Sequence, residues 1–177
     1  RTASAAVTLA ADPGHYLYSL MLDGVPQPGV YDYATETRTL TFDDVSQDHY
    51  VDAWFTIKLW TLNVVSPYST ASPAAGTYTF SHGTVVTASI EPVEPLEETV
   101  RLQCAHWELT GHAPASGVPP QMSFAITNHA TLSWRWKYAF RLLANADPGG
   151  TVAPAESWHL IGSTACVTAY PAAYYHF

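Results

Sequence analysis

The sequence is poor in charge, and above all in positive charge. Its 177 residues include seven Lys and Arg against fifteen Asp and Glu, and only 12% are charged, which gives a formal net charge of −8. Proteins that bind nucleic acids or anionic membrane surfaces concentrate Lys and Arg. The composition therefore argues against both kinds of partner, whereas a hydrophobic content of 47% is enough to build a buried core.

Long apolar runs and clustered cysteines are also missing. No uninterrupted apolar stretch reaches the roughly 20 residues that span a bilayer, so no membrane span is expected. Cys104 and Cys166 are too few for a disulfide-rich scaffold. Cys104 and His106 are expected on one face of a strand, but a metal site needs three or four converging donors. We therefore expect neither a metal nor another cofactor.

Sustained helical periodicity is the third absence. Most segments instead alternate between apolar and polar residues with a period of two, as a strand with one buried face does. The predicted strands are rich in Val, Thr and aromatic residues, are separated by Gly- and Pro-containing turns, and cover residues 39–42, 51–57, 60–65, 85–90, 100–104, 122–127, 132–136, 140–143 and 164–169. Many short strands without helices predict an all-β protein of the sandwich or barrel type.

What the sequence does contain is self-similarity. Pro13, Pro92 and Pro171 each follow an alternating strand, and the three are evenly spaced along the chain. Gly83 and Gly162, which precede the second and third of these strands, are separated by the same interval. Self-similarity at a fixed spacing indicates tandem repeats. The sequence therefore predicts a repeat of about 80 residues.

The ends of the chain are out of register with this repeat. The predicted organisation is residues 1–57 as the rear part of a first repeat, 58–137 as a complete middle repeat and 138–177 as the front part of a third. A partial repeat exposes strand edges, which folded proteins avoid. We therefore expect each partial repeat to be completed, either by a neighbouring chain joined head to tail or by continuation of a longer chain.

Motifs in the same order in each repeat carry a resemblance to a known family. They are Pro13–Tyr16 (PGHY), Ser19–Pro26 (SLMLDGVP) and Leu40–Phe55 (LTFDDVSQDHYVDAWF) in the first repeat, Cys104–Trp107 (CAHW) and Thr131–Trp136 (TLSWRW) in the second, and Pro148–Pro154 (PGGTVAP) in the third. In these motifs the chain resembles the divergent internalin-type B-repeat of bacterial surface proteins. The middle repeat is similar to a tryptophan-rich variant.

The resemblance implies a tandem all-β module of an extracellular bacterial surface or filament protein, used as a stalk, spacer or adhesive array and carrying no catalytic residues. We expect tandem immunoglobulin-like β-sandwich repeats. Because alternation does not fix strand order, β-grasp-like repeats stay open as an alternative. The segment Ser81–Gly83 is a turn rather than a nucleophile elbow, and no enzymatic activity is expected.

Large apolar residues flank the junctions between the predicted repeats. The junction residues are expected to be Phe55, Ile57, Trp60, Trp136, Tyr138 and Phe140. These runs lack Gly and Pro, so they should hold neighbouring repeats in a limited set of angles. Lys58 and Lys137 occupy equivalent places in the two runs, separated by the same interval as the prolines, and both are expected to be solvated.

The alternative function is a carbohydrate-binding module. Flat aromatic rings with a polar edge suit the faces of sugars, and the sequence contains six Trp and eleven Tyr. Trp54 and Trp107 are the ligand-binding candidates, and the partner would be a glycan or a host or cell surface. Under either function the chain is expected to act outside the cell.

Overall fold

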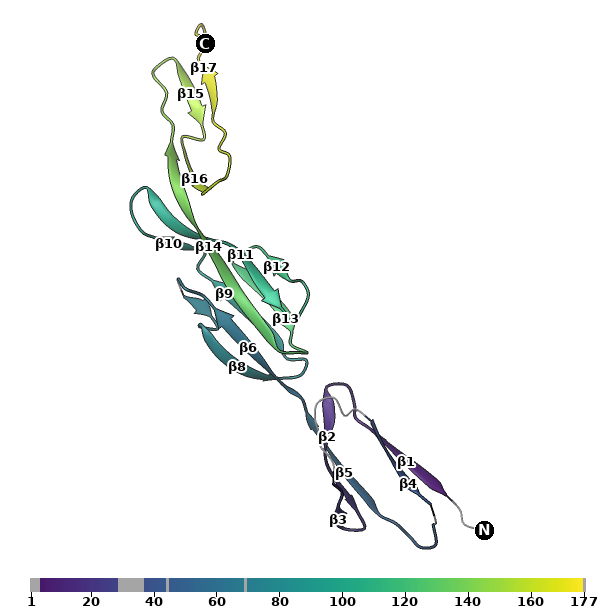
Figure 1. The fold of residues 1–177 in the computed structure, drawn as a ribbon. Helices are drawn as coiled ribbons and strands as arrows, with labels where there is room; N and C mark the ends of the chain where they lie inside the picture. The colour runs from purple at the N-terminus through teal and green to yellow at the C-terminus, as the bar shows by residue number, and fades with distance from the viewer. Residues whose placement is uncertain (1–3, 29–36, 44, 69, 177) are drawn as a thin grey trace. The chain divides into compact units, whose positions relative to one another are not determined.

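A computed structural model describes residues 4–28, 37–43, 45–68 and 70–176 (Figure 1). The described residues form 17 strands and no helix, with 60% of residues in strands, so the predicted all-β class is confirmed. Several sheets are present, consistent with a β-sandwich. The chain divides into two compact units, which comprise Arg1–Leu62, Tyr78–Val86 and Ala125–Ala130 in the first, and Asn63–Thr77, Thr87–Phe124 and Thr131–Phe177 in the second.

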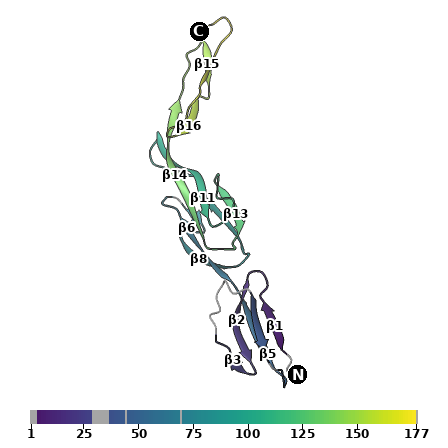
Figure 2. The same ribbon diagram turned by 45° about the vertical axis from the view of Figure 1, so that its right-hand side comes forward.

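The first unit is built around two small antiparallel sheets. One pairs β1 (Ala5–Ala10) with β4 (Thr37–Phe42). The other has the order β3 (Val25–Pro26), β2 (His15–Leu22) and β5 (Val51–Ile57), and β2 and β5 lie side by side in Figures 1 and 2. Leu17 and Leu20 of β2 are the most deeply buried residues in these sheets.

A two-residue turn joins β2 to β3. Leu22 pairs with Val25, and the two residues between them, Asp23 and Gly24, both have positive φ, at 52° and 75°. A type I′ turn needs this conformation at both central positions, and Asp-Gly is one of the few dipeptides that adopt it readily. The turn thus fixes the register of β3 against β2.

The largest sheet joins strands that are far apart in the sequence. Its order is β10 (Val93–Pro95), β11 (Val100–Thr110), β14 (Ala130–Leu143), β6 (Leu59–Val65) and β8 (Gly76–Ser81), while β12 (Ser116–Gly117) pairs with β11 and β16 (Glu156–Leu160) pairs with β14. A second sheet has the order β13 (Gln121–Ala125), β9 (Val85–Ile90) and β7 (Ala71–Ser72). The core of the second unit lies on β11, β13 and β14, and it includes Leu102, Cys104, Trp107, Leu109, Met122, Phe124, Leu132 and Trp134.

The last strands of the second unit form a thin, exposed pair. β15 (Gly150–Ala153) is antiparallel to β17 (Thr168–Pro171), and the two lie near the C-terminus in Figure 1. Every residue from 161 to 176 is exposed. These strands therefore bury almost no apolar surface of their own within the described chain.

Several strand predictions were wrong in their bounds, and the strand predicted at 100–104 extends to Thr110. The predicted strands 132–136 and 140–143 are one continuous strand, β14, since β11 pairs with it across the predicted gap. The strand predicted at 164–169 begins only at Thr168. The backbone N–H and the hydroxyl of Ser163 both donate to the Leu160 carbonyl, at 3.0 and 2.7 Å, and this turn delays the start of β17.

Candidate functional site

The predicted junction residues of the first unit form an exposed apolar stripe. Phe55 and Ile57 lie at alternate positions on β5, and Leu59 continues the alternation at the start of β6. Phe55 is opposite the buried Leu17 in the β2–β5 register, but 40% of its surface is exposed. Residues that pair directly share a face of the sheet, so this face carries buried leucines and uncovered large side chains together.

Trp60, by contrast, is held in place by two histidines. Its indole Nε1 donates to Nδ1 of His82 at 3.1 Å, and its ring meets the His129 ring edge-on with centroids 5.1 Å apart. His129 Nδ1 in turn accepts the backbone N–H of Thr61 at 3.1 Å. Trp60 is therefore an anchored residue of the first unit rather than a free contact surface.

Lys58 was predicted to be solvated, and that prediction is wrong. Only 7% of its surface is exposed. Its backbone N–H donates to the Gly14 carbonyl at 2.7 Å, and its carbonyl accepts from the His82 N–H at 2.8 Å. These main-chain hydrogen bonds hold the Lys58 backbone against the rest of the first unit. Lys137, its counterpart one repeat later, is exposed as expected.

The predicted junction residues on β14 lie at alternate positions and share one face of the strand, but they differ in burial. Tyr138 and Phe140 are exposed, whereas Ala139 between them is fully buried. Trp136 is partly buried, and its ring lies edge-to-face against Tyr68 with centroids 6.0 Å apart. Tyr138 and Phe140 thus form a second pair of uncovered apolar side chains, on the second unit.

The two tryptophans predicted to bind sugars have opposite environments. Trp54 is 46% exposed on β5. Trp107 is only 5% exposed, its Nε1 donates to the Val118 carbonyl at 3.2 Å, and its ring lies directly against Gly117. A ring this deeply covered offers no face to a sugar, because Gly117 and the core occupy both its sides.

A β-bulge in β11 separates two residues that were predicted to share a face. The register pairs Cys104 with Trp136 and His106 with Arg135, and it shifts between them at Ala105. The extra residue reverses the alternation, so Cys104 and Trp107 are buried while His106 is partly exposed. Burial raises the pKa of the Cys104 thiol. The expectation that Cys104 and His106 lie on one face is therefore wrong.

The side of β11 opposite the core carries a charged cluster. Glu108 pairs with Arg135 at 2.6 Å and with His106 at 3.2 Å. Hydrogen bonds from Arg135 first, and then from His106, lower the pKa of the Glu108 carboxyl. The cluster ties β11 to β14 just beyond the bulge and fixes the Arg135 side chain.

Next to this cluster lies a cavity of about 590 Å³, which we call the β14 cavity. The residues that line it include Tyr68, His106, Trp134, Arg135, Trp136 and Lys137. The indole N–H groups of Trp134 and Trp136 are buried and have no hydrogen-bond partner among the described residues. These N–H groups are therefore not exposed to the cavity.

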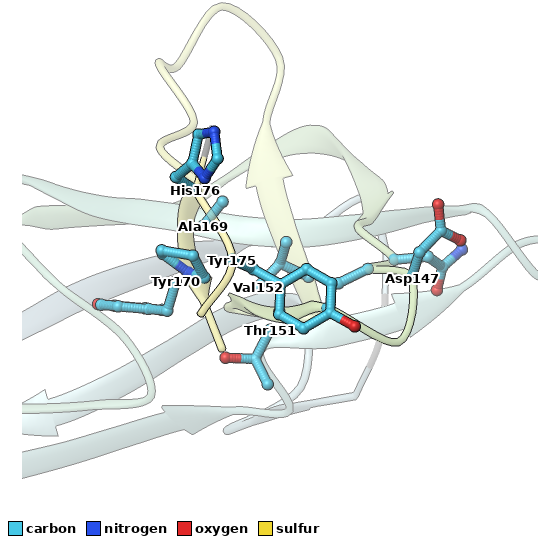
Figure 3. A pocket seen from close by; sticks show the side chains of 12 residues that line it. Asp147, Thr151, Val152, Ala169, Tyr170, Tyr175 and His176 are labelled. Carbon is cyan, nitrogen blue, oxygen red and sulfur yellow. The ribbon is translucent and has the colours of Figure 1, made fainter. Parts of the chain in front are cut away.

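A second cavity, of about 440 Å³, lies beside the β15–β17 pair (Figure 3). Asp147, Tyr170, Tyr175 and His176 line it, and the Tyr175 ring covers Gly149, where an added Cβ would come within 2.8 Å of it. All four of these side chains are exposed. This cavity consequently depends on a strand pair that has no core beneath it.

Most of the β14 cavity could not be predicted from the sequence. Trp136 was named as a junction residue, and neither Tyr68 nor Lys137 was placed in a ligand site. Tyr68 lies in a loop, and the alternation of apolar and polar residues within strands does not predict which part of a sheet a loop will contact. The bulge that turns His106 toward this side is equally invisible in the sequence.

No group of three or more His, Cys, Asp or Glu that could hold a metal ion occurs in the part of the chain that the structure describes. Among the same residues, no helix is long and apolar enough to cross a membrane. Comparisons with protein-family models, with curated proteins and with solved structures find no match. Function must therefore be argued from the geometry of the chain itself.

Proposed function

We propose that the chain is a non-catalytic structural and adhesive module of an extracellular bacterial surface or filament protein. Its units are tandem immunoglobulin-like β-sandwich repeats of about 80 residues. The units join by pairing of strand edges and by packing of the junction residues. The array of units bears mechanical load or acts as a spacer, and the chain catalyses no reaction.

One observation carries the proposal: a strand pairing recurs with the same register one repeat later. In the β7–β9 pair, Ala71 lies opposite Ile90 and Ser72 opposite Ser89. In the β15–β17 pair, Thr151 lies opposite Tyr170 and Val152 opposite Ala169. Each residue of the second set follows its counterpart in the first by a common interval, which is one residue longer than the interval between Pro92 and Pro171 and close to the expected repeat of about 80 residues. Such an agreement is expected from a repeated unit.

A second correspondence supports the same repeat. The pair β2–β5 and the pair β11–β14 are both antiparallel, and each has one register shift, between Leu17 and Ser19 in the first and between Cys104 and His106 in the second. Bulges are position-specific features of a fold. The presence of one bulge in each of these two strand pairs favours two copies of one strand plan.

The correspondence also points to an open edge on the first unit. β14 lies between β11 and β6 in its sheet. Its counterpart β5 pairs with β2, and no described strand pairs with its other edge. An unpaired edge offers a row of backbone N–H and C=O groups to a further strand. The uncovered Phe55 and Ile57 lie on this same strand.

The strands that would fill this edge have counterparts at the other end of the chain. β14 pairs with β16 through Ala139 to Leu143, and this end of β14, with β15 and β16, lies about one repeat after β6, β7 and β8. β14 is itself paired with β11 up to Phe140 and with β16 from Ala139, so we propose that a second copy of the chain adds another strand of its C-terminal part to β5, head to tail. Tyr138 and Phe140 would then pack at the junction.

Analytical ultracentrifugation of the chain over a wide range of concentration tests this function. We expect the mean mass to rise with concentration, and we expect the double variant Phe55→Lys, Ile57→Lys to remain monomeric. The matched control is Tyr18→Lys, Val25→Lys, which changes two exposed residues away from that edge and should associate normally. A chain that stays monomeric at every concentration would contradict the proposed assembly.

A further inference from the structure

We propose that β1 of one copy of the chain pairs with β15 of a second copy and displaces β17 from it. The inference rests on the proposed assembly, and it names the two strands that meet and the strand that must leave. In a single chain β17 occupies the edge of β15 that the second copy needs. β17 is therefore an intramolecular inhibitor of assembly.

β1 corresponds to β9 one repeat later. Thr8 on β1 and Thr87 on β9 are separated by the same interval as the first two of the evenly spaced prolines. The hydroxyl of Thr8 lies 3.4 Å from that of Thr39 on β4, and the hydroxyl of Thr87 lies 3.4 Å from that of Ser123 on β13. β1 thus meets β4 in the way that β9 meets β13.

β9 pairs on both of its edges, whereas β1 and β17 each pair on one. In its sheet β9 lies between β13 and β7. Among the described residues, β1 pairs only with β4, and β17 pairs only with β15. In the proposed repeat β15 corresponds to β7 and β17 to β9, because the two pairs share one register. β1 and β17 are therefore two versions of the same strand, and each has only one of the two neighbours of β9.

The apolar face of β1 is also left uncovered in the first unit. Val86 on β9 is only 4% exposed, whereas its counterpart on β1, Val7, is 38% exposed. A cavity of about 260 Å³ lies beside Val7 and is lined by Phe42 and Val51 as well. β1 therefore has an open edge and an incompletely packed face, and a further strand would satisfy the edge.

β17 is held in place by few interactions. All four of its residues are exposed, whereas three of the six residues of β9 are buried. Its pairing with β15 therefore consists mainly of main-chain hydrogen bonds. Exchange of one strand for an equivalent strand of another copy costs little, because the same main-chain bonds form again.

The middle sheet also predicts the register of the new pair. Ser72 lies opposite Ser89 in the β7–β9 pair. Val152 corresponds to Ser72 in the matching registers, and Ala10 corresponds to Ser89 by the interval between the prolines. We therefore expect Ala10 of one copy to lie opposite Val152 of the other. In the single chain Val152 lies opposite Ala169, so Ala10 and Ala169 compete for one place.

A reversible disulfide between β15 and β17 tests whether β17 must leave. The variant Val152→Cys, Ala169→Cys joins two residues that lie directly opposite each other, and such residues are close enough for a disulfide. The background is Cys166→Ser, because Cys166 is an exposed free thiol. In analytical ultracentrifugation we expect the oxidised form to associate about tenfold more weakly, or less, than the reduced form.

The matched control is Thr8→Cys, Thr39→Cys in the same background. These two residues also lie directly opposite each other, and the β1–β4 pair stays intact in the proposed exchange. The oxidised and reduced control chains should therefore associate equally. Weaker association of the oxidised control, or equal association of the oxidised and reduced Val152→Cys, Ala169→Cys chains, would overturn the strand exchange but not the assembly. If the unmodified chain and every variant stay monomeric, both are contradicted.

Mixed single variants identify the strand that pairs with β15. Chains that carry Ala10→Cys and chains that carry Val152→Cys, both with Cys166→Ser, should form a mixed disulfide on mild oxidation, which mass spectrometry detects. A mixture of Ala169→Cys and Val152→Cys chains should form much less. A preference for the Ala169→Cys partner would show that copies exchange β17 with each other and that β1 does not enter, which contradicts the proposal.

Discussion

Gly117 shows how closely a single residue of the second unit is packed. Its position leaves no room for a side chain, since a Cβ there would come within 2.7 Å of Cε2 of the Trp107 ring, which is itself buried. The ring cannot move outward without losing its hydrogen bond to the Val118 carbonyl. At this residue the need for glycine is steric and does not depend on a special backbone conformation.

We therefore predict that Gly117→Ala destabilises the second unit by about 1–3 kcal/mol, the usual cost of overpacking a core. Urea unfolding followed by tryptophan fluorescence measures the change. Ser116→Ala, one position earlier on the same strand and exposed, is the control and should unfold like the unmodified chain. Equal stability of Gly117→Ala and the control would show that the ring of Trp107 is free to shift.

A second prediction at the residue scale concerns pH. The Asp23 carboxylate accepts a hydrogen bond from the Tyr50 backbone N–H at 2.8 Å and pairs with His49 Nδ1 at 2.8 Å. The bond with His49, and then that with Tyr50, lowers the pKa of Asp23 below 3.8. A carboxyl whose pKa is lower when folded stabilises the fold above its unfolded pKa, and this contribution disappears as the pH falls through the folded value.

Asp23→Asn should accordingly be less stable than the unmodified chain at neutral pH, and the difference should shrink as the pH is lowered below 3.8. Denaturant midpoints of the two chains, measured side by side from neutral to acid pH, test this. Asp52→Asn, an exposed carboxyl on β5, controls for the general effect of removing a negative charge. A difference that is independent of pH would mean that the Asp23 interactions do not survive in solution.

At the scale of elements, the bulge at Ala105 decides which side chains enter the core. Without it, Cys104 and Trp107 would point to opposite faces of β11, because side chains alternate along a strand. With it, both are buried, and His106 faces the charged cluster. One inserted residue thus provides both the core packing and one wall of the β14 cavity.

Deletion of Ala105 should therefore turn either Cys104 or Trp107 out of the core and cost about 3–5 kcal/mol if the large ring is lost. Thermal unfolding followed by circular dichroism measures this loss. Deletion of Ala172, an exposed residue near the end of the chain, is the control and should leave the transition in place. A deletion of Ala105 that unfolds normally would mean that β11 slips to a new register without penalty.

The same elements show how far the sequence predicts the fold. Alternation located β5, β6 and β9 well, since each strand has a period of two in its sequence. It did not predict β8 and β16. It also placed Cys104 and His106 on one face of β11, because the bulge between them was not predicted. Bulges and the paths of loops depend on contacts with residues distant in the sequence, so a local sequence pattern cannot predict them. The β14 cavity was missed for this reason.

At the scale of the whole molecule, the central claim is that repeated strand sets complete one another across copies. The matching registers of β7–β9 and β15–β17 favour a repeated unit. The open edge of β5 and the exposed residues 161–176 indicate where a further strand would add. A solenoid-like array of this kind gains stability from each added junction.

Hydrogen–deuterium exchange of β5, measured by mass spectrometry at low and high protein concentration, tests this claim most directly. Amides on an unpaired edge exchange rapidly, and pairing with a new strand protects them. We predict that exchange in Val51–Ile57 slows as the concentration rises, while exchange in the turn at Asp23 and Gly24 does not change. Exchange in β5 that is the same at every concentration would contradict the claim.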